Sequence, residues 1–379
     1  MTRPRLFPTQ EIGSIARPRW QLEGQRGAAL SPAAVEEFRR WNGKLGFAPP
    51  EAPGGAPGAA AAPVPAATVR DWAALFGLRY FESLGLDRVY DGEARRVEMY
   101  EAAVRQMRGF EFQGHVRSFD NKYYLKAAGT GPVGLDRPYH LEEFDFVRDH
   151  ARAEPKVPVT GAYTIADWSY NEHYLGQRTG WKGRSVRRAA QREFVVEVAR
   201  AALRPTLRAL IDHGARVIQI DEPAAGTHPD EADLVAEGFN AATEGLDAEF
   251  TMHICFSEYR RLFPALLEAK RCAQWTWEFA NRDGPDHDAY QLLEMFREYG
   301  DRRAIGLGVL DVHRDLVESP EVVEDRILRA VRVLGDPERL WINPDCGLRT
   351  RSLDVAAQKL AHMVEGARRA RARFERPDA

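Results

Sequence analysis

The sequence lacks most of the features that mark secreted, membrane-bound or nucleic-acid-binding proteins. It has only 3 cysteines in 379 residues, a sparse and odd set that argues against a disulfide framework and favours a reducing compartment. No run of about 18 apolar residues is present, and residues 1–5 lack the apolar stretch of a secretory signal. The formal net charge of -3 includes no concentrated basic excess. We therefore expect a cytoplasmic protein with no membrane and no nucleic-acid partner.

The composition indicates one large globular unit with a single foreign segment. With 44% hydrophobic residues, the chain can bury a large core. Residues 48–68 are almost all Ala, Pro and Gly without periodicity, and such a segment buries too little apolar surface to offset its ordering entropy. We predict a disordered low-complexity insertion there, within a single domain spanning residues 1–379. Helix-spaced apolar residues flank it, over 32–41 and 69–84.

Strands and helices alternate over the rest of the chain. The β-rich runs cover residues 158–165, 216–220, 249–256, 304–312 and 340–342. Helical patterns cover residues 186–211, 322–334 and 353–374. Alternation of this kind is typical of parallel β-α units, so a closed (β/α)8 TIM barrel is the leading prediction and an open doubly wound sheet is second. In a barrel, the chemistry gathers at the carboxyl ends of the strands.

Side chains that can bind a metal fall at these strand ends. His253 and Cys255 are two residues apart, so both point to one side of their strand. Glu278 ends the next β-α unit, and Cys346 follows the strand at 340–342. Any one cysteine is more often a small core residue, which is our interpretation of Cys272. The combination at equivalent points of repeating units instead predicts a zinc site.

A series of short motifs, in order along nearly the whole chain, resembles the C-terminal catalytic barrel of cobalamin-independent methionine synthase. The motifs are Ile12-Gly13-Ser14, Asp91-Gly92-Glu93, Thr164-Ile165-Ala166-Asp167-Trp168-Ser169-Tyr170, Ile218-Gln219-Ile220-Asp221-Glu222-Pro223-Ala224, His253-Ile254-Cys255-Phe256, Asp311-Val312-His313 and Asn343-Pro344-Asp345-Cys346-Gly347-Leu348. Each motif is modest alone, and their order makes the resemblance specific. The sequence departs from the family pattern at Ile15, where the family has Phe, and at Asp91, where the family has His.

The resemblance implies a TIM barrel and a role for each matching residue. It implies zinc ligands at His253, Cys255, Glu278 and Cys346. It implies homocysteine contacts at Ile12, Ser14, Glu93 and Asp221, a general acid at His313, and an aromatic platform for the pterin of the donor at Trp168. The N-terminal half of the long family members, which helps to hold the folate tail, has no counterpart here. The methyl donor is therefore left open between 5-methyltetrahydrofolate and a methylcorrinoid, with a corrinoid or auxiliary protein as a further expected partner.

The chemistry explains why these residue types are needed. A thiol with an ordinary pKa of about 8.5 is a poor nucleophile until it loses its proton, and zinc coordination removes that proton. Acceptor-only carboxylates such as Glu93 and Asp221 suit an α-ammonium group. Three functions stay open: methyl transfer to homocysteine, a zinc-dependent reaction of another thiol such as coenzyme M with an epoxide, and a non-catalytic zinc-binding scaffold. The two acidic residues and the complete ligand set favour the first.

Overall fold

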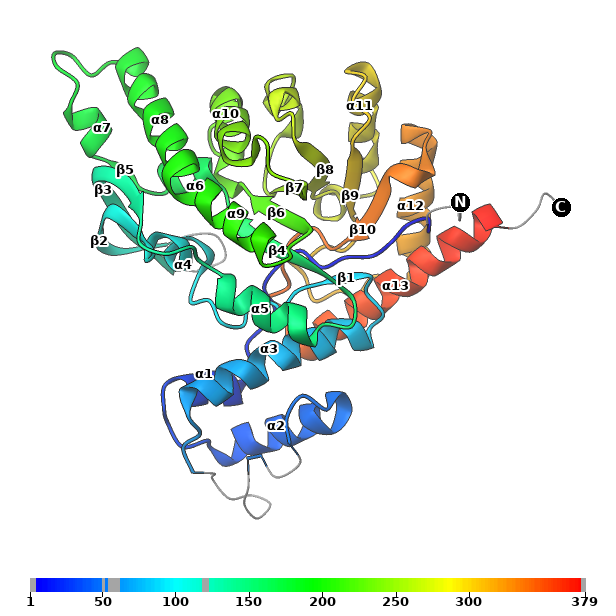
Figure 1. Ribbon diagram of the computed structural model, residues 1–379. Coiled ribbons are helices and arrows are strands. Elements are labelled where there is room, and N and C mark those ends of the chain that lie inside the picture. Colours follow the sequence, from blue (N-terminus) through cyan, green and yellow to red (C-terminus); the bar gives the residue numbers. More distant parts are fainter. Residues whose placement is uncertain (1–4, 50–51, 54–61, 118–122, 376–379) are drawn as a thin grey trace.

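The computed structural model describes residues 5–49, 52–53, 62–117 and 123–375. Its main sheet has seven parallel strands in the order β1-β4-β6-β7-β8-β9-β10. These strands are β1 (Arg88–Val89), β4 (Glu154–Thr160), β6 (Val217–Asp221), β7 (Glu249–Ile254), β8 (Cys272–Trp277), β9 (Ala304–Gly308) and β10 (Leu340–Asn343). The sheet curls, with helices along its outer side (Figure 1). The prediction of a parallel α/β architecture is confirmed.

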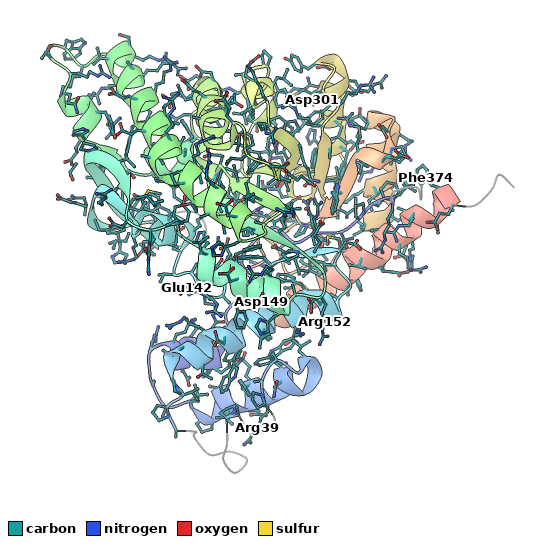
Figure 2. All side chains as sticks on the ribbon, viewed as in Figure 1. Arg39, Glu142, Asp149, Arg152, Asp301 and Phe374 are labelled. Atoms are coloured by element: carbon teal, nitrogen blue, oxygen red, sulfur yellow. The ribbon has the colours of Figure 1, made fainter. Side chains whose placement is uncertain are left out.

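The chain segment before the first helix lies between the two edge strands of this sheet. Thr9 forms a parallel bridge to Ile342 of β10, and Gln10 forms one to Arg88 of β1. The Gln10 N–H donates to the Ile342 carbonyl at 2.9 Å, and the Arg88 N–H donates to the Thr9 carbonyl at 3.1 Å. The same segment is tied to the C-terminal helix, because Phe374 lies 5.5 Å from the ring of Phe7 (Figure 2).

The helices depart from a regular eightfold repeat. Long helices follow some strands, whereas short 3-10 turns follow β7 and β8. A closed barrel of eight strands, each followed by a helix, therefore stays a prediction. The α-helices are α1 (Arg19–Gln25), α2 (Pro32–Leu45), α3 (Ala66–Ser83), α4 (Met99–Val104), α5 (Leu141–His150), α6 (Ala162–Asp167), α7 (His173–Gly176), α8 (Arg184–Val198), α9 (Arg204–Asp212), α10 (Ala232–Thr243), α11 (Glu294–Glu298), α12 (Pro320–Leu334) and α13 (Leu353–Glu375). None of the helices in the described part of the chain combines the length and apolar character that a bilayer-spanning segment needs.

The predicted long helix over 186–211 is confirmed as a continuous run of α8, a π-helical turn and α9. The π-helical turn covers Ala199–Leu203, and Pro205 is the second residue of the following helix α9. Proline lacks an N–H, and its ring crowds the carbonyl four residues earlier in an α-helix. The wider turn accommodates this residue without ending the helix.

One strand prediction is wrong in its second half. β4 ends at Thr160, and the residues after Gly161 form α6 instead of continuing the strand to 165. The cause is a remote side chain: the Glu222 carboxylate accepts the backbone N–H groups of Tyr163 at 3.2 Å and Thr164 at 2.7 Å. Capping of a helix start by a residue from another strand leaves no local sequence signal. The strands predicted over 249–256 and 304–312 likewise end early, at Ile254 and Gly308.

Residues 50–51 and 54–61 of the insertion predicted over 48–68 lie outside the described residues. Its last three residues, 66–68, form the first turn of α3, so the predicted end is too late. Pro65 precedes this helix, and Ala66 and Ala67 are strong helix formers. The flanking helix α2 begins with Ser31 accepting the N–H of Ala34, as expected for an N-cap.

A separate hairpin, which the sequence patterns did not predict, lies beside the main sheet. It consists of β2 (Met107–Arg117) and β3 (Tyr123–Leu135), with the short β5 (Tyr170–Asn171) along one side (Figure 1). Residues of β2 alternate between exposed and partly covered positions and contribute little to the core. The hairpin matters for function because some of its residues line a cavity at the carboxyl ends of the barrel strands.

Candidate active site

A histidine and two cysteines converge from the carboxyl ends of β7 and β10, which are separated in the sheet by β8 and β9. His253 is the penultimate residue of β7, Cys255 directly follows that strand, and Cys346 lies three residues beyond β10. One ligand atom from each of the three side chains lies within 4.8 Å of the others. Soft sulfur and imidazole ligands at this spacing are typical of zinc sites.

The His253 ring is oriented as a metal ligand would be. Its Nδ1–H donates to the Thr276 carbonyl at 3.0 Å. This hydrogen bond leaves the buried Nε2 as the acceptor nitrogen, and Nε2 makes no hydrogen bond within the described structure. Fixing one ring nitrogen through a carbonyl is the usual way in which proteins aim the other nitrogen at a metal.

Glu278, the fourth predicted ligand, lies at the edge of this cluster and outside the group of three. It is fully buried directly after β8, and its Oε2 accepts the Phe256 N–H at 2.9 Å and the Asn281 side-chain amide at 3.0 Å. Its Oε1 is buried without a hydrogen-bond partner. Burial, together with the nearby Cys346 sulfur, raises the pKa of Glu278 to about 7. An unsatisfied buried carboxylate oxygen beside two cysteines is the feature expected of a ligand that lacks its ion.

The pKa values of the two cysteine thiols are shifted in opposite directions. A hydrogen bond from the Cys255 thiol, supported by His253, holds the pKa of Cys346 well below its ordinary value. The same contact and burial raise the pKa of Cys255 well above its ordinary value. The arrangement thus favours a thiolate at Cys346 even before a cation is considered.

The cluster forms one end of a cavity of about 510 Å³. Nine of the ten residues predicted to form the site line this cavity, and Glu278 is the exception. They are Ile12, Ser14, Glu93, Trp168, Asp221, His253, Cys255, His313 and Cys346. A volume of this size is typical of a site for small molecules.

The Ile12–Ser14 turn approaches the Cys346 segment closely. A Cβ atom added to Gly347 would lie 3.0 Å from both the N and the O atoms of Ser14, so a side chain there would push the Ser14 backbone away by a few tenths of an ångström. Glu93 faces the same turn, because a Cβ on Gly13 would lie 3.5 Å from its Oε1. Glu93 has a φ of 58°, an uncommon left-handed conformation that is held by a hydrogen bond from its N–H to the Asp91 carboxylate at 2.8 Å.

Asp221 ends β6 and is held from the barrel interior. The side-chain amide of Gln219 donates to its Oδ1 and to the Ile12 carbonyl, both at 2.7 Å. Gln219 in turn accepts the Lys156 ammonium at 2.6 Å, and Lys156 also donates to the carbonyl of Glu11. Burial raises the pKa of Asp221 to about 7, although nearby His253 opposes the shift. A cationic ligand beside this carboxylate would restore its charge.

His313 and Trp168 lie on other walls of the cavity. The backbone N–H of His313 donates to the Asp311 carboxylate at 2.8 Å. The imidazole ring of His313 lies 4.7 Å from the ring of Phe256. Trp168 ends α6 and stacks on Tyr124 of the hairpin, with ring centroids 5.0 Å apart and planes at 25°. The predicted aromatic platform is therefore a pair of rings, one of which comes from the hairpin.

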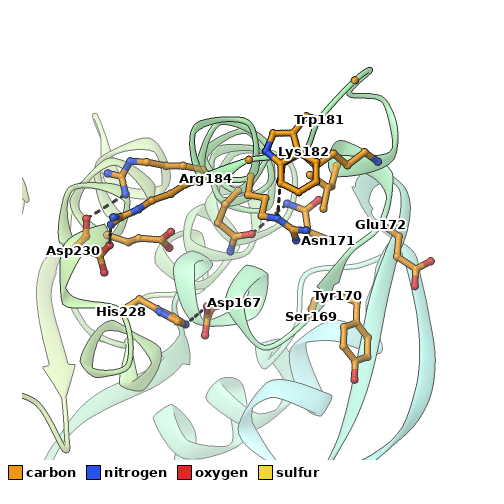
Figure 3. Close-up of a pocket in the computed structure, with 17 residues that line it drawn as sticks. Asp167, Ser169, Tyr170, Asn171, Glu172, Trp181, Lys182, Arg184, His228 and Asp230 are labelled. Atoms are coloured by element: carbon orange, nitrogen blue, oxygen red, sulfur yellow. Dashed lines mark hydrogen bonds and ion pairs between the residues drawn. The ribbon is translucent and has the colours of Figure 1, made fainter.

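A larger cavity of about 1180 Å³ lies beside the first, and Figure 3 shows the residues around it. The two cavities share the segment around Trp168, because Asp167 and Ser169 line the second one. Its charges are largely paired: Arg184 bonds Asp230, and His228 lies 3.6 Å from Asp167. Its described lining includes no cysteine. The chemistry therefore belongs to the smaller cavity.

Several lining residues were not predicted from the sequence. Arg17 and Arg349 each lie three residues beyond a predicted site residue, and Tyr124 comes from the unpredicted hairpin. Both arginines lie close in sequence to a predicted site residue, Arg17 to Ser14 and Arg349 to Cys346. This closeness could have indicated that they line the same cavity.

The fold and the cavity together define an α/β enzyme that gathers cysteine, histidine and carboxylate side chains where parallel strands end. Residues 76–369 match the family described as the catalytic domain of cobalamin-independent synthase. The chain belongs to the cobalamin-independent methionine synthase family, and the resemblance found in the sequence is confirmed.

Named relatives and solved structures agree with this family. The chain is 33% identical over 372 residues to a methionine synthase of Pyrococcus furiosus, covering 98% of this chain and 95% of the relative. It is 38% identical over 307 residues to a methionine synthase of Thermoplasma volcanium, covering 76% and 85%. The solved structure of a B12-independent methionine synthase from Shewanella sp. W3-18-1, in complex with selenomethionine, has a TM-score of 0.73 at 22% identity and covers 97% of this chain and 99% of that chain. That structure supports the fold.

Proposed function

We propose that this protein transfers a methyl group to the zinc-bound thiolate of homocysteine and so forms methionine. The observation that carries the proposal is the convergence of His253, Cys255 and Cys346 at one end of a cavity whose walls also hold Glu93 and Asp221. The His253, Cys255 and Cys346 cluster suits a sulfur atom, and the Asp221 carboxylate beside it suits the ammonium group of an amino acid. The family and its named relatives support the same reaction.

The residues present fit a zinc ion. His253, Cys255 and Cys346 would hold it, with Glu278 as a fourth ligand through its unsatisfied Oε1. When bound, zinc would keep the substrate thiol deprotonated at neutral pH. The Phe256 N–H and the Asn281 amide hold the Oε2 atom of Glu278, so its Oε1 would be free to coordinate the ion without moving the side chain.

The amino-acid end of homocysteine would be held by opposite charges. Asp221 and Glu93 accept hydrogen bonds from the α-ammonium group, and the Ser14 turn offers a hydroxyl and a backbone N–H to the α-carboxylate. Gln219 fixes both the Asp221 carboxylate and the Ile12 carbonyl, so the two halves of this binding surface move as one. A fixed amino-acid end orients the sulfur for in-line attack.

The methyl donor is either 5-methyltetrahydrofolate or a methylcorrinoid, the latter brought by a corrinoid protein. A methylpterin leaves as a strong base and needs a proton, and His313 lines the cavity as the candidate general acid. The Trp168–Tyr124 pair offers a flat apolar surface for a pterin ring. A methylcorrinoid needs no such proton, so the two donors make different demands on His313.

The metal is tested by the zinc content of the purified protein. We expect about one zinc per chain, lost in Cys346→Ser and retained in the matched control Cys272→Ser. Cys272 is buried at the start of β8, outside the cluster, so it controls for the loss of a buried thiol. A wild-type protein that binds no zinc after reconstitution would refute the mechanism.

The reaction is tested with zinc-loaded protein and homocysteine or coenzyme M, each with methyltetrahydrofolate, methylcobalamin or an epoxide. Methionine from homocysteine supports the proposal. A thioether formed only from coenzyme M and an epoxide would support the alternative reaction on another thiol. Zinc binding without any product would instead indicate a scaffold.

A further inference from the structure

Two arginines line the candidate active site without an acidic partner. Arg17 and Arg349 both face the 510 Å³ cavity. Among the described residues, neither forms an ion pair with a carboxylate, whereas most other arginines of the chain do. Unpaired cations that come from remote parts of the sequence and share one cavity are a signature of an anion-binding site.

Arg17 is anchored by one nitrogen and open at the others. Its Nη2 donates to the carbonyls of Arg96 and Val97, the latter at 3.4 Å. Its Nε and Nη1 make no hydrogen bond with the described residues and are not sealed from the cavity. A guanidinium fixed at one corner is pre-oriented to donate two parallel hydrogen bonds to an oxyanion.

Arg349 is presented by a tight turn next to the Ser14 segment. The Arg351 N–H donates to the Leu348 carbonyl at 3.0 Å, which places Arg349 inside the turn, and buried Leu348 anchors it. The residue before this turn, Gly347, is the one whose added Cβ would lie 3.0 Å from Ser14. Arg17 lies three residues beyond Ser14, so both arginines extend from the same point of closest approach.

The two guanidinium groups affect each other. Burial and the charge of Arg349 lower the pKa of Arg17 to about 10, a value at which it still carries its charge at neutral pH. Like charges this close repel, and an anion between them would remove the repulsion while satisfying the open donors. The charges of Glu93 and Asp91 offset part of this repulsion, and an anion bound between the two guanidinium groups would offset the rest.

We propose that Arg17 and Arg349 form an oxyanion subsite that holds the acidic group of the thiol substrate. The proposal rests on the proposed function and specifies how the amino-acid end is recognised: the carboxylate lies between Ser14 and the two arginines, while the ammonium lies on Glu93 and Asp221. The location favours the thiol over the donor, because the Arg349 turn approaches Ser14 and the charge of Glu93 acts on Arg17.

The test compares the binding of methionine with that of 3-(methylthio)propylamine, which is methionine without its carboxylate. Both are measured by calorimetry on the zinc-loaded protein, so neither turnover nor a free thiol is required. In Arg17→Gln and Arg349→Gln, methionine should bind about 10- to 100-fold more weakly, and the amine should bind within about twofold of wild type.

Two neighbouring arginines provide matched controls. Arg19 is exposed two residues after Arg17, and Arg351 pairs with Asp315 at 2.6 Å outside the cavity. Arg19→Gln and Arg351→Gln should leave the affinity for methionine unchanged. Equal losses for methionine and the amine in the two test variants, or equal losses in the controls, would overturn the proposal.

Two further arms separate the sources of the oxyanion. If the test variants weaken methylcobalamin but not methylcobinamide, which lacks the phosphate-bearing loop, and leave methionine unaffected, the arginines hold the donor and the proposal is wrong. Arginine-dependent binding of 2-mercaptoethanesulfonate without binding of methionine would keep the subsite and overturn homocysteine as the substrate. Failure of the subsite and failure of the proposed function are therefore distinguishable.

Discussion

Replacing Asp345 by Asn should weaken both the fold and the candidate metal site. Asp345 is fully buried directly before Cys346, and its carboxylate accepts the backbone N–H groups of residues 279–281 at 3.0, 3.0 and 2.7 Å. These residues directly follow Glu278. One side chain thus fastens the segment that carries Cys346 to the segment that carries Glu278, although 68 positions separate the two in sequence.

The magnitude follows from the three hydrogen bonds. The substitution Asp345→Asn preserves shape, but it turns one acceptor oxygen into an NH₂ group that faces a buried N–H. Leaving that donor unsatisfied costs about 1–3 kcal/mol. We expect the free energy of unfolding to fall by about 1–3 kcal/mol. Because the ligand segments would no longer be held together, zinc affinity should fall about 10- to 100-fold.

Urea unfolding and competition with a chelator measure these two effects. Asp301 supplies the control, since it is buried near the amino end of β9 and accepts the Trp275 indole N–H at 2.7 Å (Figure 2). The substitution Asp301→Asn should lower stability without changing zinc affinity. If the two variants weaken zinc binding equally, loss of stability explains the effect, and the proposed link between the ligand segments is wrong.

Three further changes test other parts of the site. His313→Asn should retain zinc and homocysteine binding but lower turnover from methyltetrahydrofolate about 100-fold, and turnover from methylcobalamin less, in steady-state assays with both donors. Gly347→Ala places a Cβ 3.0 Å from Ser14 N and O, so the KM for homocysteine should rise about tenfold or more, as kinetics can show. Glu11 is buried with both carboxylate oxygens unpaired, and burial raises its pKa from 4.5 to about 8. Because the folded state then binds the proton more tightly than the unfolded state, the free energy of unfolding should fall between about pH 4.5 and 8, by on the order of 5 kcal/mol. Urea unfolding of Glu11→Gln across this range should show a smaller decline, while the part that comes from Asp221 and Glu278 remains.

The sequence could predict the metal cluster because its geometry is local and repeated. His253 and Cys255 share a side of one strand through the period of two, and parallel strands bring Cys346 to the same edge. Glu278 was expected to be equivalent to these residues, but it lies at the edge of the cluster because Phe256 and Asn281 hold its Oε2. The exact position of a long side chain depends on such neighbours, which no spacing reveals.

The parts that the sequence could not predict depend on contacts between remote segments. α6 begins early because Glu222 caps it from another strand. The hairpin has few buried residues, so its apolar pattern is weak, yet it supplies Tyr124 to the cavity wall. A cationic side chain such as Arg349 is usually solvated, and it faces the cavity here because its segment approaches Ser14 at Gly347.

The two ends of the cavity are built with different rigidity, and this difference bears on the open question of the donor. The thiol end rests on buried polar side chains of the barrel, where Lys156, Gln219 and Asp221 form one hydrogen-bonded chain. Networks of this kind fix a single geometry, because each unsatisfied member would carry a large desolvation penalty. The donor end instead includes a hairpin that lies outside the main sheet and contributes one ring of the aromatic pair. Under the proposed function, the thiol would therefore be recognised by side chains of the core, and the donor in part by Tyr124 of the hairpin.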